Sequence, residues 1–400
     1  MGISDWRGIT RLATQATNGV ARIVEGVHQN VWSSMGFPSG KTPGETRGFT
    51  RMIYQTINGT TQLVGKSADT ALAGLQRVLD PGDGIAPESP RRRTFLSVAN
   101  GVIGDHLVND NNPFAIPMTL TPQVSVPSQK VSGKVLLLIH GLCMNDLQQH
   151  AGQNNYELEY GQLLAGKLGY HPVYLRYNSG LHVSQNGREL AARLEQWLEL
   201  WPTEVVDLSV LAHSMGGLLI RSAFHYARQE GLNWPERVKH IVFLGTPHHG
   251  APLERVGNWL DLVLGSIPHT RPFTALAKVR SAGVTDLRYG NVLDEDWHGR
   301  DRFKLNPDER SIAPLPDTAN CYSVAATLAK SRSALADHVI GDGLVPLHSA
   351  LGRHKTPARN LGFDDKSQFI AYNTNHMNLL NSREVSEQVV EWLTPGQAGR

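Results

Sequence analysis

From about residue 94 the chain alternates between short apolar runs and stretches with the three-and-four spacing of amphipathic helices. The runs contain few polar residues, whereas a strand with one face in water alternates polar and apolar positions. Apolar strands separated by helices predict the α/β class, with a mainly parallel sheet covered by helices on both faces. The expected strands are "KVLLLIH" (134–140), "HPVYLRY" (171–177), "VVDLSVLAH" (205–213) and "VKHIVFLGT" (238–246), with further apolar runs at 321–327 and 369–372, and the expected helices lie at about 155–168, at about 184–200 and from 215.

The N-terminal region has a different pattern. Apolar residues recur at helical spacing over about 5–33 and again over about 46–79, which predicts a helical hairpin. The segment "DPGDGIAPESPRRR" (80–93) is rich in turn formers and charge, as is typical of a linker. We therefore expect a helical extension, 1–93, followed by a catalytic domain, 94–400. Two roles for the hairpin stay open, because its apolar stripe can pack on the second domain or contact a lipid surface or partner.

Composition narrows the class of protein. The chain has 400 residues, 40% of them hydrophobic, and a formal net charge of +2, which gives no reason to expect a nucleic-acid partner. Cys143 and Cys321 fit neither a disulfide framework nor a metal-ligand spacing, so a reducing compartment is expected. The N-terminus lacks the apolar core of a secretory signal, and no stretch of 18 apolar residues follows. These features predict a cytoplasmic protein, with peripheral lipid contact through the N-terminal helices left open.

One serine stands where an apolar strand pattern meets a helical pattern. In "VLAHSMGGLLI" (210–220), Ser214 is flanked by the small residues Ala212, Gly216 and Gly217. A sharp strand-to-helix turn needs small neighbours, because the two backbones nearly touch there. Such a turn presents the serine at the helix N-terminus, so Ser214 is the candidate nucleophile.

A serine hydroxyl needs a base to remove its proton and an acid to orient that base. Asp342 lies in a Gly-flanked loop after the run 321–327, and His376 lies just past the run 369–372. The resulting order, Ser, Asp, His, is that of the nucleophile-elbow hydrolases. The rivals are Asp337 for the acid and His348 or His213 for the base. Asp337 lacks flanking glycines, His348 is close to Asp342 along the chain, and His213 is expected to pack beside the turn.

At these positions the chain resembles the α/β-hydrolase superfamily, specifically its bacterial lipase and esterase branch, and it is also similar to GPI inositol-deacylase-like proteins. The resemblance covers roughly 95–395 and rests on five segments in order. One departure is Ala212, which stands where the first glycine of the elbow is usual. The N-terminal hundred residues have no counterpart in the family's minimal fold. The segments are "LLLIHGLC", "AHSMGG", "FLGTPHHGAPL", "GDGLVPLHSALG" and "NHMNLL".

The resemblance also implies an oxyanion hole. In such hydrolases two backbone N–H groups bind the oxyanion of the tetrahedral intermediate, one from the residue after the nucleophile and one from a strand-ending loop. Here these are Met215 and Leu142, with His140, Gly141 and Gly216 forming the supporting turns.

The substrate pocket is expected around four residues. Cys143 follows the oxyanion loop and is expected to be a small packed residue, and His248 begins a His-His pair expected to shape the pocket wall. No carboxylate or cysteine stands at ligand spacing from that pair, so no metal is expected. The segment 251–318 includes an apolar patch with Trp259 and Leu264. In the branch that the chain resembles, such an insertion usually forms a cap or lid over the pocket. The alternative is a set of helices packed permanently on the body.

These observations predict a serine carboxylic-ester hydrolase that acts through an acyl-enzyme on short- to medium-chain esters. The expected partner is a small-molecule or lipid ester, and the chemistry requires no cofactor. An acyltransferase, thioesterase or amidase would use the same three residues. A protein that binds lipid surfaces through its N-terminal hairpin is an alternative from a different class.

Overall fold

The computed structural model describes residues 90–123, 131–145, 159–252, 281–300, 308–330 and 341–396. The predicted hairpin and the candidates Trp259, Leu264 and Asp337 lie outside these ranges. Within them, no helix is long and apolar enough to cross a membrane.

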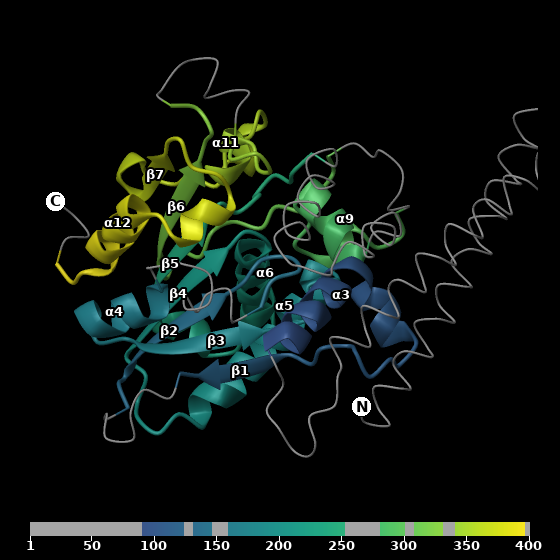
Figure 1. Ribbon diagram of the computed structural model, residues 1–400, viewed down its shortest axis with the longest axis horizontal. Helices are drawn as coiled ribbons and strands as arrows, with labels where there is room; N and C mark the ends of the chain where they lie inside the picture. The colour runs from purple at the N-terminus through teal and green to yellow at the C-terminus, as the bar shows by residue number, and fades with distance from the viewer. Residues whose placement is uncertain are drawn as a thin grey trace, which may run out of the picture.

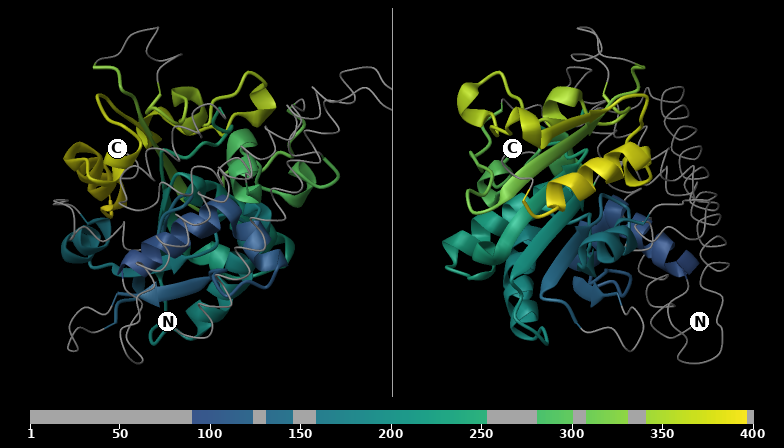
Figure 2. Two further views of the ribbon diagram at one scale, coloured as in Figure 1. Left: turned by 45° about the vertical axis from the view of Figure 1, so that its right-hand side comes forward. Right: turned by 90° about the vertical axis from the view of Figure 1, so that its left-hand side faces the viewer.

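Seven strands form one sheet in the order β1-β3-β2-β4-β5-β6-β7. Strand β1 pairs antiparallel with β3, and the other pairs are parallel (Figure 1). Figure 2 shows the strands side by side from two further directions. The bounds are β1 Thr119–Pro122, β2 Lys134–Ile139, β3 His171–Arg176, β4 Asp207–His213, β5 Val238–Leu244, β6 Asn320–Ala326 and β7 Gln368–Ala371. The described residues form an α/β-hydrolase fold, as the sequence predicted.

The apolar strands bury both faces of the sheet, as strand β2 illustrates. Val135, Leu137 and Ile139 belong to a core shared with α3, α5 and α6, whereas Leu136 and Leu138 point to the other face and pack with residues of α4 and α12. All five side chains are at most 1% exposed. This is why the run has no polar alternation. The helices are α3 Pro90–Asn109, α4 Tyr160–Leu168, α5 Val183–Glu199, α6 Met215–Gln229, α9 Ala282–Tyr289, α11 Leu347–Ala350 and α12 Arg383–Leu393.

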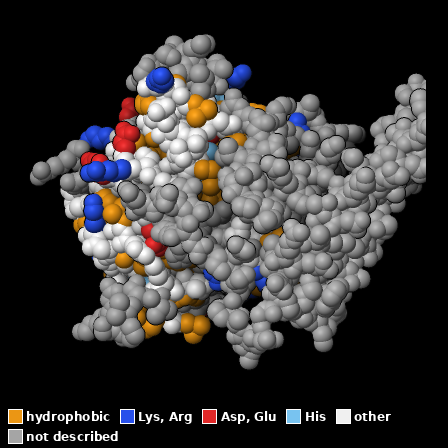
Figure 3. Space-filling view, viewed as in Figure 1, with side chains coloured by type: hydrophobic (Ala, Val, Ile, Leu, Met, Phe, Trp, Pro, Cys, Tyr) orange, Lys and Arg blue, Asp and Glu red, His pale blue; other side chains and the backbone are white. Residues whose placement is uncertain are grey.

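Short 3₁₀ turns complete the connections between these elements. They are η2 Trp234–Arg237, η4 Asp294–Asp296, η5 Pro357–Arg359, η6 Asp365–Ser367 and η7 Met377–Leu380. On the described part of the face seen in Figure 3, side chains of both charge signs intermingle, in keeping with the small formal net charge.

Helix α3 begins at Pro90, inside the segment that the sequence analysis read as a linker. Proline suits the first turn of a helix because the N–H it lacks has no acceptor there. Phe95, Val98 and Val102 of α3 belong to the main core. The part of 251–318 that the structure describes is also packed there, through Val284 and Leu287 of α9.

Candidate active site

Four of the loops that carry predicted site residues leave the same edge of the sheet. His140 follows β2 and Ser214 follows β4, while Asp342 and His376 lie beyond β6 and β7. These strands are parallel, so their carboxyl ends meet at one edge, where open α/β sheets bind ligands. The topology thus gathers residues that are far apart in the sequence.

Ser214 has a strained backbone. Its φ is 55° and its ψ is −123°, although a non-glycine residue rarely adopts a positive φ. Its N–H donates to the Leu244 carbonyl of β5 at 2.8 Å, and its own carbonyl accepts from the Gly217 N–H at 3.0 Å. These bonds hold the turn in place. Backbone strain of this kind is typical of functional sites.

The glycines after the serine allow the close approach of α6 to the sheet. A Cβ on Gly216 would lie 2.8 Å from the Ile139 carbonyl oxygen, and a Cβ on Gly217 would lie 2.0 Å from Thr246 Oγ1. Both distances are shorter than a non-bonded contact between carbon and oxygen allows. The two glycines are therefore required by packing between α6, β2 and the loop after β5.

Asp342 and His376 form a buried pair. His376 Nδ1 lies 2.6 Å from Asp342 Oδ2, and each side chain is 1% exposed. The other carboxylate oxygen, Oδ1, accepts from the Leu344 and Val345 amides at 2.9 and 2.8 Å. The His376 amide donates to the Asp342 carbonyl at 3.1 Å. The loops after β6 and β7 are thus joined by both side chain and backbone, which fixes the orientation of the imidazole ring.

The second ring nitrogen, His376 Nε2, is buried and has no hydrogen-bond partner among the described residues. The imidazole lies beside the elbow, because the ring centroids of His213 and His376 are 4.8 Å apart. His213 Nε2 is 3.3 Å from the His376 carbonyl oxygen. Burial and the neighbouring His376 hold the pKa of His213 well below its usual range, so His213 is neutral and can donate through Nε2. It packs beside the turn and positions the backbone of His376.

The loop after β2 lies against the serine. A Cβ on Gly141 would be 3.0 Å from Ser214 Cβ. Within this loop the Cys143 amide donates to Ser179 Oγ at 3.0 Å, and the Met144 amide donates to the Gly141 carbonyl at 3.3 Å. Neither bond uses the Leu142 amide.

Met215 is the first residue of α6, so its N–H has no acceptor within the helix. The two amides expected to bind the oxyanion therefore lie close together. The Met215 amide belongs to the elbow, and the Leu142 amide belongs to a loop that touches the elbow. A helix N-terminus also favours negative charge.

Two residues that support this loop were not found in the sequence. The Tyr177 ring stacks on His140 with centroids 4.4 Å apart, and its hydroxyl donates to the His140 carbonyl at 2.8 Å. Ser179 accepts the Cys143 amide. Tyr177 ends the run predicted at 171–177 and Ser179 lies two residues further on, so their position at the carboxyl end of a strand was the one available signal.

The remaining sequence candidates are not part of the serine, histidine and aspartate assembly. Cys143 is fully buried, and burial raises the pKa of its thiol, so it is a poor nucleophile. His348 is exposed on α11. His248 packs against Phe363 and faces Arg221, at a cavity described below.

The fold and the turn define a class of protein: an α/β-hydrolase fold with a serine at its strand-to-helix elbow and a buried histidine and aspartate beside it. Among families, a model described as "Domain of unknown function (DUF7379)" matches residues 106–286. No curated protein matches the sequence.

Solved structures with a similar arrangement include hydrolases. Bacillus licheniformis lipase BlEst2 in mature form is 18% identical, with 68% of this chain and 98% of the lipase covered and a TM-score of 0.42. An alpha/beta hydrolase superfamily protein from Enterococcus faecalis is 15% identical, with 69% and 94% covered and a TM-score of 0.35. A Pyrobaculum calidifontis esterase is 15% identical, with 75% and 89% covered and a TM-score of 0.35.

Proposed function

We propose that the protein is a serine hydrolase that cleaves carboxylic esters of short to medium acyl length through an acyl-enzyme on Ser214. The observation that carries the proposal is the buried His376–Asp342 hydrogen bond of 2.6 Å beside a serine with a positive φ. A histidine whose Nδ1 is bound to a carboxylate has its Nε2 available as a base, and here Nε2 is otherwise unoccupied among the described residues.

In the proposed reaction Ser214 Oγ attacks the ester carbonyl carbon while His376 Nε2 takes the hydroxyl proton. The carbonyl oxygen becomes an oxyanion, which accepts hydrogen bonds from the Leu142 and Met215 amides. As the intermediate collapses, the imidazolium returns the proton to the departing alcohol. Asp342 stabilises the imidazolium throughout. Water then attacks the acyl-enzyme with His376 again as the base, and the carboxylic acid leaves.

The contacts around the site support this assignment of roles. The oxyanion amides must be held rigidly, because losing one such donor typically costs about 3 kcal/mol in barrier. Ser179 binds the amide next to Leu142, and Tyr177 binds the carbonyl of His140, so the loop is held on both sides of the proposed donor.

The test is hydrolysis of a series of p-nitrophenyl esters, from acetate to palmitate, by the purified wild type and Ser214→Ala. We expect the wild type to prefer short or medium chains and the variant to fall to background, a loss on the order of a million-fold in kcat. Ser222→Ala is the matched control. Ser222 Oγ donates to the Val292 carbonyl and lies in the interior of α6, so activity should stay within a few-fold of wild type.

An inactive wild type, or a Ser214→Ala variant that keeps its activity, would contradict ester hydrolysis. If the wild type cleaved the matching thioesters or anilides as fast as the esters, the bond it cleaves would have to be assigned as a thioester or an amide instead of a carboxylic ester. Release of p-nitrophenol together with acyl transfer to an added alcohol, with no free acid formed, would show a transferase instead.

A further inference from the structure

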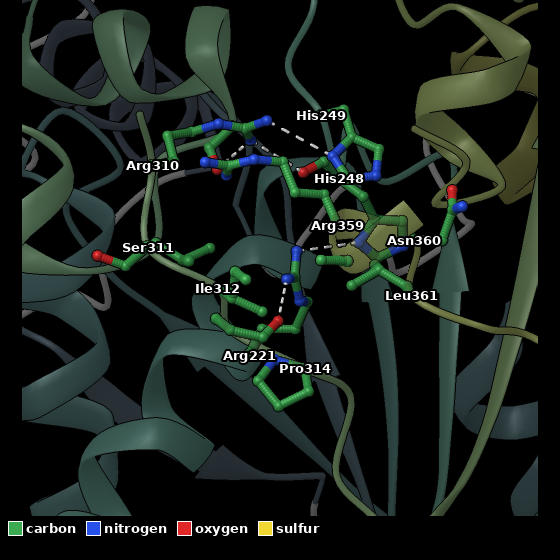
Figure 4. Close-up of a pocket in the computed structure, with 14 residues that line it drawn as sticks. Arg221, His248, His249, Arg310, Ser311, Ile312, Pro314, Arg359, Asn360 and Leu361 are labelled. Carbon is green, nitrogen blue, oxygen red and sulfur yellow. Dashed lines mark hydrogen bonds between the residues drawn. The ribbon is translucent and has the colours of Figure 1, made fainter. Parts of the chain in front are cut away.

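A cavity beside α6 is lined by none of the three proposed catalytic residues (Figure 4). It is bordered by α6, by the segment that follows β5, by residues just after α9, by residues 310–314 and by η5 with the residues that follow it. Its volume is about 70 Å³, whereas one water molecule needs roughly 10–15 Å³ by the same kind of measure. Its wall includes the exposed residues Ile312, Pro314, Ala358 and Asn360, so it opens toward solvent.

Arg221 forms the floor of this cavity from the middle of α6. Only 6% of the residue is exposed. Its guanidinium contacts the Ala313 carbonyl through Nη2 and lies 3.4 Å from His248 Nδ1 through Nη1. Its Nε is buried without a hydrogen-bond partner among the described residues. A buried, charged donor that lacks an acceptor is costly unless a ligand supplies one.

Two further arginines reach the same cavity from other segments. Arg310 donates to the carbonyls of His248 and Gly290 at 3.3 and 3.1 Å. It also binds the carboxylate of Asp308 at 2.8 and 2.9 Å, and Arg359 Nη1 lies 3.6 Å from that carboxylate. The two arginines hold the pKa of Asp308 well below its usual range, and His354 Nε2 lies 3.1 Å from the same carboxylate.

The charges around the cavity do not cancel. Asp296 is the carboxylate whose charge acts on Arg221, and it already accepts the backbone amides of Val292, Leu293 and Ser311. Three guanidinium groups therefore face two carboxylates among the described residues. Burial and the charge of Arg310 lower the pKa of Arg221 to about 10, so it still carries its charge at neutral pH.

His248 adds a neutral donor. Burial, together with Arg221, holds the pKa of His248 well below its usual range. Because Arg221 approaches its Nδ1, that nitrogen is the acceptor and the proton is on Nε2. Nε2 is buried and has no hydrogen-bond partner among the described residues. The cavity thus has an excess of positive charge. It also has two buried nitrogen atoms, Arg221 Nε and His248 Nε2, that have no acceptor among the described residues.

We propose that this cavity binds a phosphate group, held by Arg221, Arg310 and Arg359. Guanidinium groups match the oxygens of phosphate, and three of them reach the cavity from three separate segments, which suits a ligand with oxygens on several sides. A planar carboxylate offers two oxygens and would meet fewer of these donors. The site is independent of the proposed ester hydrolysis, because none of its residues belongs to the serine, histidine or aspartate assembly.

The test is calorimetric titration of the full chain with inorganic phosphate near pH 7, at an ionic strength held constant with sodium chloride. We expect saturable binding of one phosphate per chain and an unfolding temperature that rises with phosphate concentration. Arg359→Gln should bind at least ten-fold more weakly, because it removes a charged donor at the rim of the cavity. Arg353→Gln is the matched control, since Arg353 is exposed, precedes the same turn and donates to Gln368 instead.

Further arms of the experiment locate the site and identify the ligand. Ser214→Ala should bind phosphate as the wild type does, whereas loss of binding would place the anion at the proposed active site and overturn the proposal. Absence of saturable binding, or unchanged binding by Arg359→Gln, would also overturn it. Glycerol 3-phosphate binding as tightly as phosphate supports a phosphate ester as the ligand, and weaker binding supports the free ion. If acetate bound at the cavity as tightly as phosphate, the proposed preference for phosphate over a carboxylate would be wrong.

Discussion

Two pairs of histidine and aspartate in the described part of the chain are nearly alike in their contact. In one, His376 Nδ1 lies 2.6 Å from Asp342 Oδ2, and in the other His182 Nδ1 lies 2.9 Å from Asp286 Oδ2. Both aspartates are at most 2% exposed. We propose catalysis for the first pair and a structural role for the second, so the contact between histidine and aspartate does not by itself define a function.

The difference lies in the surroundings. The His182 ring stacks on Trp297, with centroids 3.7 Å apart and planes 5° apart. Asp286 also accepts the amide of Val183, the first residue of α5, at 2.8 Å, and the side-chain amide of Asn291 at 3.0 Å. A carboxylate at a helix N-terminus stabilises the helix. This pair therefore joins α5 to α9, whereas His376 lies beside a strained serine at the carboxyl edge of the sheet.

The largest expected effect separates the two histidines. His376→Gln should lower kcat on p-nitrophenyl esters by a factor on the order of 10⁵ to 10⁶, because the base is lost. His182→Gln should leave kcat within about three-fold of wild type. Steady-state kinetics on purified variants with matching circular dichroism spectra measure both. Comparable losses of activity in the two variants would remove the distinction.

The two aspartates provide a second comparison of activity. Asp342→Asn should reduce kcat by about 10⁴, because the amide no longer holds the imidazole in the correct tautomer. Asp286→Asn keeps the shape of the side chain at the structural pair and should retain most of the activity. If the Asp342 variant kept more than a tenth of wild-type kcat, Asp342 would not be the orienting acid.

Stability should show the opposite order. Asp286→Asn weakens hydrogen bonds at the start of α5 and leaves His182 without its carboxylate. We expect a loss of about 2 kcal/mol in the free energy of unfolding, which for a chain of this length is about 2–3 °C in Tm. Urea denaturation followed by circular dichroism gives the free energy, with Asp365→Asn on the exposed turn η6 as the control. A wild-type Tm for Asp286→Asn would mean that the pair does not hold α5 and α9 together.

The smallest expected effect is a pH dependence of Tm. It comes from buried histidines that contact no carboxylate of the described residues. Burial lowers the pKa of His249 to about 4 and lowers those of His213 and His248, from an ordinary value near 6.5. Below that value the unfolded chain binds protons that the folded chain does not, so stability falls as the pH decreases toward 4. We expect Tm to drop by a few degrees between pH 7 and pH 5.

His249→Gln should flatten part of that decrease, since it removes one group whose pKa differs between the folded and unfolded chains. His298→Gln, at an exposed position, is the matched control and should leave the slope unchanged. Thermal melts at constant ionic strength measure the slope. An unchanged slope in His249→Gln would assign the acid sensitivity to other groups.

The strands were predictable because their signal is local. The run predicted at 134–140 is strand β2, Lys134–Ile139, and the one predicted at 205–213 is β4, Asp207–His213. Apolar residues on both faces require burial on both sides, and this requirement is visible along the chain itself. Strand β1 was not predicted. It is a four-residue edge strand with half of its positions exposed and a proline at its end, so its sequence pattern is weak, and it exists through pairing with β3.

Helix α12 was also missed, although its signal is ordinary. Ser382 caps its first turn by accepting the Val385 amide, and Val385, Val389 and Trp392 lie on one buried face. Helix α3 was missed for a different reason. Its first residues were read as part of a charged linker, and only packing of its apolar side chains on the sheet shows that the helix includes them.

The sequence by itself determined the α/β class, the elbow at Ser214 and the loops that carry Asp342 and His376, because apolar runs and small residues at a turn are local constraints. The tertiary structure decided which distant residues meet. Asp286 contacts His182 across 104 positions, and Arg221 shares a cavity with Arg310 and Arg359. No spacing along the chain encodes these contacts, since they depend on how helices pack on the sheet. For the same reason, only the structure showed that one histidine stacks on a tryptophan while the other keeps a ring nitrogen without a partner among the described residues.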